Sequence, residues 1–277
     1  MEIRTRLEQE LVTTADELDE PLWVSKRSLA AVHGCEAHYL ADRKIPFTYS
    51  IPVARGSVAH KAIELSVHIG SPRSPAVLVT EAIEILSEGQ NALADFLHHL
   101  DEAERAELVG ESIAMVSGFL DTFPPLRRGW RPTTEPSKRA ELCSNKITLG
   151  GRFDLTLGAP DDTTAGRVII DTKTGGFSPE HREDMRFYAL IETLVTGVPP
   201  LMIATHYLES GRLHEEMVDE NVLDAAVRRT VDGVRRLALL DRHPTEAVRK
   251  PGPPCRWCPI SEDCEPGSAW LTDHNDW

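Results

Sequence analysis

Apolar residues in the N-terminal half recur at the three- to four-residue spacing of amphipathic helices. The segments that follow this spacing are residues 28–43, 57–69 and 76–121. Ser25 or Ser28 is a suitable cap for the first of these helices, and Gly56-Ser57 precede the second. The intervening stretch 44–56 contains two prolines and predicts a loop. The acidic side chains of the third segment are expected to face solvent.

The period changes to that of β-strands after about residue 138. Short apolar or alternating runs, bounded by Gly, Pro and Asp, occupy 140–158, 167–175, 202–210 and 211–218. Gly150-Gly151 and the segment 158–166 predict turns. Helical patterns return at 180–197 and 219–242. This order predicts an α/β fold (α+β mixed), with a central mixed β-sheet flanked by helices.

The length of 277 residues (30.8 kDa) is ample for a buried core and predicts one or two domains. Residues 1–24 are polar and acidic, and we expect a loosely docked acidic lead-in there. The sequence has no run of 18 apolar residues, and charges stand where a secretion signal needs an apolar stretch. We therefore expect a cytoplasmic protein with no membrane partner.

The net charge of −14, from 44 acidic and 30 basic residues, at first argues against a nucleic-acid partner. The charge is unevenly distributed, however. Residues 25–61 carry +4 and residues 127–152 carry +5, whereas the helical segment 62–126 between them carries −9. The basic stretches are either the walls of a positive groove or the solvated faces of unrelated elements.

Two carboxylates in the strand region are candidates for catalysis. Asp171 ends an apolar strand and is separated by one residue from Lys173, so both side chains share a face. If the strands at 152–157 and 167–173 form a hairpin, Asp154 lies near Asp171. Such a pocket suits Mg²⁺ or Mn²⁺. The plainer interpretation of an Asp-x-Lys sequence is a surface ion pair.

His60 and Glu64 are four residues apart and therefore share one face of the predicted helix 57–69. A histidine at such a position is more often packed and hydrogen-bonded than a ligand. Its possible role in binding a metal depends on whether this face is directed toward Asp154 and Asp171.

These residues together carry a family resemblance. Gly56-x3-His60-x3-Glu64, Gly151-Arg-Phe-Asp154, Ile-Ile-Asp171-Thr-Lys173-Thr-Gly175 and a helix with Phe-Tyr188-Ala-Leu resemble the RecB-like branch of the PD-(D/E)XK nucleases. The motifs stand in the family's order over residues 25–264.

The resemblance implies a PD-(D/E)XK nuclease core in a single domain, 25–277, with a helical insertion at 70–126. It implies that His60, Asp154, Asp171 and the Thr172 carbonyl hold the metal, and that Lys173 assists the attacking water. Glu64 matches a motif residue that would either orient the metal ligands from behind or be an alternative metal ligand. Tyr188 matches the catalytic-helix tyrosine, although packing explains this residue equally well. The sequence departs from the family at Asp184, where a Gln is usual.

Three of the five cysteines are clustered near the C-terminus, and the full set is Cys35, Cys143, Cys255, Cys258 and Cys264. In a chain without a secretion signal this cluster favours a metal site over disulfides. The spacing alone fits zinc or an iron–sulfur cluster, with Cys35 or Cys143 as the fourth ligand. The resemblance to the iron–sulfur subset of RecB-like nucleases, including the AddB nuclease domain and CRISPR-associated exonucleases, implies a 4Fe-4S cluster. Its ligands would be Cys35, Cys255, Cys258 and Cys264, from the elements 28–41 and 250–267, while Cys143 is a small core residue.

The sequence therefore predicts a divalent-metal-dependent DNA nuclease that degrades single-stranded ends in DNA repair, recombination or defence. A helicase or other repair partner is compatible with this role but has no specific signal. The alternative is a non-catalytic nucleic-acid-binding or scaffold subunit with the same fold, which the substitution of Asp184 favours.

Overall fold

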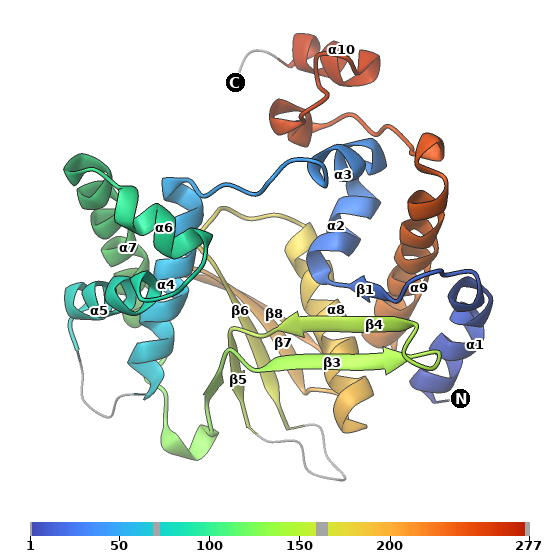
Figure 1. The fold of residues 1–277 in the computed structure, drawn as a ribbon. Coiled ribbons are helices and arrows are strands. Elements are labelled where there is room, and N and C mark those ends of the chain that lie inside the picture. Colours follow the sequence, from blue (N-terminus) through green and yellow to red (C-terminus); the bar gives the residue numbers. More distant parts are fainter. Residues whose placement is uncertain (1, 69–72, 159–165, 275–277) are drawn as a thin grey trace.

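The computed structural model describes residues 2–68, 73–158 and 166–274 as a mixed α/β fold (Figure 1). The main helices are α1 (Ile3–Asp16), α2 (Lys26–Gly34), α3 (Glu36–Asp42), α4 (Ile51–His68), α5 (Pro75–Ser87), α6 (Ala92–His99), α7 (Glu102–Thr122), α8 (Glu180–Thr196), α9 (Glu220–Arg242) and α10 (Glu265–Asp273). The strands are β1 (Leu22–Val24), β2 (Thr133–Thr134), β3 (Ser137–Leu142), β4 (Ile147–Arg152), β5 (Leu155–Leu157), β6 (Val168–Lys173), β7 (Met202–Tyr207) and β8 (Arg212–Met217). Short 3₁₀ helices are η1 (Arg128–Trp130), η2 (Pro244–Glu246) and η3 (Pro253–Trp257). Within the described ranges, no helix is both long and apolar enough to cross a membrane.

A five-stranded sheet with the order β2-β5-β6-β7-β8 forms the centre of the fold. Strands β6 and β7 are parallel and are connected through α8, whereas the other neighbours are antiparallel. Successive residues of β6 point to opposite faces: Ile169 packs with α8 and α9, and Ile170 packs with helices α4–α7. Helices therefore cover both faces of this sheet, and the predicted mixed α/β fold is confirmed.

The lead-in expected at 1–24 is instead part of the core. Helix α1 buries Leu7 and Leu11 completely, because its leucines recur at helical spacing on one face. Strand β1 then pairs in parallel with β4 in a second, three-stranded sheet of order β1-β4-β3. The polar residues of this segment are those of its solvent-exposed face.

The predicted helix at 28–43 is two helices, and the predicted loop at 44–56 is shorter than expected. Ser25 caps α2, since its side chain accepts a hydrogen bond from Ser28 N, and the chain breaks at Cys35 before α3. Helix α4 begins at Ile51 rather than after Gly56. Its proline is in the first turn, where a backbone N–H is not needed.

Two glycines that were expected to form a turn lie inside β4. A Cβ on Gly150 would lie 2.2 Å from the Trp23 ring, and a Cβ on Gly151 would lie 2.6 Å from the Tyr188 ring. These glycines therefore allow close packing on the strand rather than a reversal of the chain. The turn is formed by residues 143–146, so Cys143 lies in a turn with φ 50° and not in a strand.

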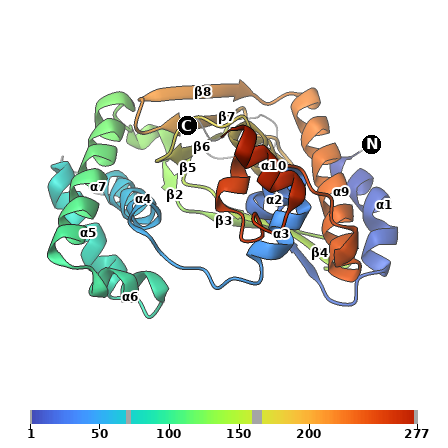
Figure 2. The ribbon, with the colours of Figure 1, turned by 90° about the horizontal axis from the view of Figure 1, so that it is seen from above.

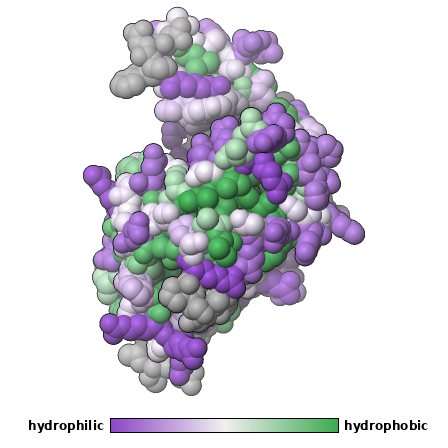
Figure 3. Space-filling model, turned by 90° about the vertical axis from the view of Figure 1, so that its left-hand side faces the viewer, coloured by the Kyte–Doolittle hydropathy of each residue, from purple (hydrophilic) through white to green (hydrophobic). Residues whose placement is uncertain are grey.

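The helices predicted over 76–121 are confirmed as α5, α6 and α7, which pack beside α4. Positions 70–72 of the expected insertion, and 159–165 of the expected loop, lie outside the described residues. The face in Figure 3 carries apolar side chains over this helical layer. The C-terminal elements η3 and α10 lie over α2 and α3 in both ribbon views (Figures 1 and 2).

Candidate active site

The hairpin of β5 and β6 brings Asp154 and Asp171 to the same end of the sheet, as predicted. Leu155 pairs with Ile170, so the residues that flank this pair are adjacent. Asp154 Oδ2 accepts hydrogen bonds from Thr172 N at 2.7 Å and Thr172 Oγ1 at 3.0 Å. These bonds fix the Asp154 carboxylate against β6.

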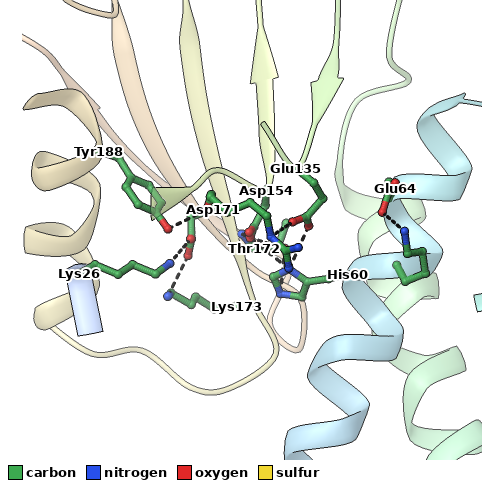
Figure 4. A network of polar contacts seen from close by, with 11 residues as sticks. Lys26, His60, Glu64, Glu135, Asp154, Asp171, Thr172, Lys173 and Tyr188 are labelled. Carbon is green, nitrogen blue, oxygen red and sulfur yellow. Dashed lines mark hydrogen bonds and ion pairs between the residues drawn. The ribbon is translucent and has the colours of Figure 1, made fainter. Parts of the chain in front are cut away.

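Asp171 is almost completely buried and lies between two lysines (Figure 4). Lys26 Nζ donates a hydrogen bond to Asp171 Oδ1 at 2.7 Å, and Lys173 Nζ lies 2.9 Å from Oδ2. The predicted shared face of Asp171 and Lys173 is therefore present. Lys26, at the start of α2, was not predicted. Burial opposes the charge of Lys26, but the Asp171 carboxylate raises its pKa above the ordinary value.

His60 extends from α4 toward the carboxylates (Figure 4). Its Nδ1 lies 3.4 Å from Asp154 Oδ2 and 3.9 Å from Glu135 Oε1. Burial disfavours the imidazolium, but the negative charge of Asp154 outweighs burial and raises the pKa of His60 to about 9. The same contact lowers the pKa of Asp154 despite its burial.

Glu135 is the other site residue that was not predicted from the sequence. It follows β2 with φ 52°, and its backbone N–H donates to Asp154 O at 3.1 Å. Arg152 Nε lies 2.6 Å from Glu135 Oε2 and orients the carboxylate. The only feature of the sequence that marks Glu135 is that an acidic residue precedes a proline within the basic stretch 127–152.

Glu64 lies away from this group. Its carboxylate forms an ion pair with Lys61 Nζ at 2.6 Å, on a part of α4 that is not directed at Asp154 (Figure 4). Helical spacing placed His60 and Glu64 on one broad face, but only His60 reaches the sheet end.

Tyr188 is buried beside the site. Its hydroxyl donates to Arg152 O at 2.8 Å, and Lys26 Nζ lies 4.7 Å from the ring centroid. The ring packs against Phe153 and against Gly151. Tyr188 therefore supports Lys26 and the strand that leads to Asp154.

Asp184, the residue at which the sequence departs from the resembled pattern, is directed at Lys173. Its Oδ2 lies 3.6 Å from Lys173 Nζ. Burial raises the pKa of Asp184, and the neighbouring Lys173 and Lys26 charges oppose that rise. The lysine pair thus shares two carboxylates, Asp171 and Asp184.

The donor set fits a divalent cation. Ligand atoms of His60, Glu135 and Asp154 lie within 4.8 Å of one another. Asp171 lies outside this three-residue group, and its buried Oδ2, which accepts no well-directed hydrogen bond from the described residues, is 2.9 Å from Lys173 Nζ. Imidazole nitrogen and carboxylate oxygen are ligands that suit Mn²⁺, and the oxygens suit Mg²⁺.

Four of the cysteines line a second cavity, where the tail covers α2 and α3. These are Cys35, Cys255, Cys258 and Cys264. Burial raises the pKa of Cys258, and the three neighbouring thiols add to the rise. Gly267 packs closely there, since a Cβ would lie 3.3 Å from Cys264 Sγ.

Cys143 lies apart from this cavity. Its Sγ is 3.9 Å from Glu8 O, and the side chain packs against the core next to α1. The structure therefore separates the four cysteines of the expected cluster from the fifth.

The sequence pattern of the PD-(D/E)XK nuclease superfamily matches residues 24–265 of this chain. The match covers nearly the whole fold and includes the residues described above. The chain belongs to the PD-(D/E)XK nuclease superfamily. Its members are nucleases that use divalent metals, in agreement with the donor set at the sheet end.

One solved structure supports the fold. A protein from Eubacterium rectale, provisionally described as an exonuclease, has a TM-score of 0.50 and 11% identity over 89% of this chain and 87% of its own. The protein SSO0001 is 15% identical over 77% of this chain and 96% of its own, with a TM-score of 0.34. No curated protein matches this nuclease-superfamily chain.

Proposed function

We propose that this protein is a divalent-metal-dependent DNA exonuclease that acts on single-stranded ends, in DNA repair, recombination or defence. The observation that carries the proposal is the convergence of His60, Asp154, Asp171 and Lys173 at one open sheet end. A scaffold subunit does not require all four groups together. The nuclease activity follows from membership of the superfamily, whereas the preference for single-stranded DNA rests on the RecB-like resemblance.

The residues of the site would have two separate roles, metal binding and stabilisation of charge on the phosphate. His60, Glu135, Asp154 and Asp171 would hold the cation, with the Thr172 carbonyl as the further ligand implied by the family motif. When bound, the cation would polarise the phosphodiester and lower the pKa of a bound water. Lys173 Nζ, 2.9 Å from Asp171 Oδ2, is placed to stabilise negative charge on the phosphate and to orient the attacking water. Attack of the water oxygen on phosphorus breaks the bond to the leaving oxygen, which takes up a proton.

The site is open to a polymer substrate. Its pocket has a volume of about 310 Å³ and is lined by Lys26, His60, Asp154, Asp171 and Lys173, by Gly175 and Gly176 of the loop after β6, and by His181 at the start of α8. An open pocket lined mainly by polar groups matches backbone-directed chemistry, which needs little readout of the bases.

We assign a 4Fe-4S cluster to the cysteine cavity, because the chain resembles the iron–sulfur subset of RecB-like nucleases and because Cys35, Cys255, Cys258 and Cys264 line one cavity. Four thiolates are also a ligand set for tetrahedral zinc, so the choice of the cluster over zinc rests on the resemblance. Lys250 N and Gly252 N each donate to a sulfur at 3.4 Å, of Cys35 and Cys255 respectively, as suits a thiolate-bound cluster.

The activity is tested with end-labelled single-stranded, double-stranded and circular DNA, each incubated with Mn²⁺, Mg²⁺ or EDTA. We expect metal-dependent release of short products from linear single strands and no cleavage of circles. Cleaved circles would indicate an endonuclease, and no cleavage of any substrate would favour the scaffold alternative.

Asp171→Ala and Lys173→Ala should each lower the rate by about 1,000-fold or more, because metal binding or charge stabilisation is lost. Glu64→Ala is the matched control on α4, since Glu64 contacts Lys61 and not the carboxylate group. Undiminished cleavage by the purified, folded Lys173→Ala protein would contradict the proposed mechanism.

The cluster is tested by absorption. An anaerobic preparation should be brown, with absorption near 400 nm and about four irons per chain. A colourless preparation that contains stoichiometric zinc would overturn the assignment.

A further inference from the structure

One large apolar side chain is exposed beside the active site without an evident structural need. Phe177 lies in the loop between β6 and α8, four residues after Lys173, and 64% of its surface is exposed. The rest of the Phe177 ring packs against two other aromatic rings. It contacts His214, with centroids 5.2 Å apart, and Tyr207, with centroids 5.9 Å apart.

Tyr207, His214 and His181 form a ring cluster next to Phe177. Tyr207 is buried, and its ring centroid lies 5.3 Å from that of His214. The Tyr207 hydroxyl is 3.0 Å from His181 Nδ1. Burial and the nearby Lys173 charge lower the pKa of His181 to about 4, so this ring is neutral at neutral pH. The ring cluster is therefore aromatic, and its neutral His181 ring is not repelled by the active-site lysines.

Phe177 lines two cavities, and Tyr207 and His214 line both of them as well. One has a volume of about 420 Å³ and also contains Arg212 and Glu209, and the other has a volume of about 390 Å³. Both volumes are in the range of small-ligand sites. Arg212 and Glu209 form no ion pair with any described residue, so the larger cavity offers a free guanidinium and a free carboxylate.

The larger cavity adjoins the catalytic pocket. Gly175 and Gly176 line both cavities, so one loop borders the proposed metal ligands and the ring cluster. A Cβ on either glycine would meet nothing within 4 Å, so their surface is open. A polymer with its phosphate at Lys173 thus has a path over these glycines to Phe177.

We infer that Phe177, with Tyr207 and His214 beneath it, stacks a nucleobase of the single strand next to the phosphate being cleaved, while Arg212 binds a neighbouring phosphate. This inference rests on the proposed function and specifies how that site selects its substrate. A base in a duplex is already stacked on its neighbours, whereas a base in a single strand has a free face. Aromatic stacking tolerates any base, and this tolerance suits degradation without sequence preference.

The test compares oligonucleotides with and without bases. Wild-type protein is titrated in EDTA with labelled single-stranded DNA, and with the same strand carrying abasic sites near one end. We expect at least fivefold weaker binding of the abasic strand at the position that stacks. A 2-aminopurine at that position should show quenched fluorescence in the complex.

Three variants of one residue provide matched controls. Phe177→Ala and Phe177→Leu should weaken binding of the normal strand about 5- to 100-fold and abolish the discrimination against abasic DNA, since neither offers a flat ring. Phe177→Tyr should retain both properties. Phe177→Leu keeps the apolar character, so its failure assigns the effect to stacking rather than to apolarity.

The outcomes separate the two proposals. Wild-type cleavage with equal binding of normal and abasic strands, or a Phe177→Leu protein that behaves as wild type, would overturn the stacking site alone. A wild-type protein that neither binds nor cleaves DNA would overturn the proposed function, and the stacking site with it. In that case the exposed ring would be better explained as a contact for a protein partner.

Discussion

Asp171 illustrates how individual residues set the chemistry of the site. Lys26 Nζ donates to Oδ1 at 2.7 Å, and Lys173 Nζ lies 2.9 Å from Oδ2. The two lysines thereby fix the orientation of the Asp171 carboxylate. We regard Lys26 as a positioning residue, because its contact is with Asp171 rather than with the reacting atoms.

Lys26→Met is expected to lower kcat by about 10- to 100-fold while KM changes little, since a displaced carboxylate of the metal site disturbs the reacting geometry. Lys26→Arg should recover part of the loss by donating to the same oxygen. The measurement is steady-state cleavage of single-stranded DNA across a range of Mn²⁺ concentrations. A raised KM with an unchanged kcat would instead assign Lys26 to DNA binding.

At the residue scale, the sequence predicted that Asp154, Asp171 and Lys173 lie together. Asp171 and Lys173 follow from the two-residue period of a strand, and Asp154 follows from pairing its strand with theirs. Glu135 and Lys26 could not be predicted this way, because Glu135 lies in the bend after β2 and Lys26 begins α2, and each reaches the site through tertiary contacts. The separation of His60 and Glu64 depends on the rotation of α4 against the sheet, which a helical period does not specify.

Among the elements, α8 and β8 are joined by a cluster of charges at the edge of the central sheet. Glu216 accepts hydrogen bonds from Arg186 at 2.7 Å and from Arg182 at 2.6 Å. Burial raises the pKa of Glu216, but the hydrogen bonds from the two arginines outweigh burial and lower it below the ordinary value of 4.5. A lowered folded-state pKa contributes stability above pH 4.5, and this contribution is lost as the pH falls below that value.

Glu216→Gln should therefore reduce the free energy of unfolding by about 1–3 kcal/mol at pH 7, because Arg186 is left partly buried without its charge partner. The difference from wild type should shrink as the pH falls toward 4. Urea unfolding at pH 7 and pH 4 measures this. Arg182→Gln is the control, since its side chain is 63% exposed and its loss should cost less than about 1 kcal/mol. A pH-independent effect of Glu216→Gln would exclude the ion pair as its cause.

The glycines of β4 show why a strand can be mistaken for a turn. Gly-Gly is a turn signal in isolation, but here each missing side chain leaves room for an aromatic ring that comes from elsewhere in the fold. Nothing local to 150–151 encodes Trp23 or Tyr188. The strand could therefore be recognised only once its packing partners were placed.

Gly151→Ala should destabilise the protein by about 1–3 kcal/mol, because the new Cβ would lie 2.6 Å from the buried Tyr188 ring. Displacement of Tyr188 should also disturb Lys26 and reduce cleavage. Gly110→Ala is the matched control, since a Cβ there meets nothing within 4 Å and lies in α7. That variant should be neutral or more stable by up to about 1 kcal/mol. Equal losses of stability in the two variants would contradict the packing argument.

Across the whole molecule, the fold class and the order of elements followed from the sequence, because the change from a helical to a strand period is encoded locally. The role of the two chain ends was not encoded in this way. Helix α1 and strand β1 complete the core, and the tail after α9 returns to α2 and α3. The polar composition of residues 1–24 gave no indication that α1 and β1 belong to the core. Only the cysteine pattern indicated that the tail packs against α2 and α3.

Cys35 and Cys255 are 220 residues apart, so a cluster that joins them closes most of the chain into one loop. Cys35→Ser should remove absorption near 400 nm and lower Tm by about 5–10 °C, as for loss of a long-range cross-link. Cys143→Ser should retain both properties, since Cys143 lies beside α1 and outside the cysteine cavity. Lys173→Ala should also retain them, and this separates loss of the cluster from loss of catalysis. Loss of the 400 nm absorption in Cys143→Ser but not in Cys35→Ser would reverse the ligand assignment, and equal Tm values for all three variants would rule out a stabilising link between the chain ends.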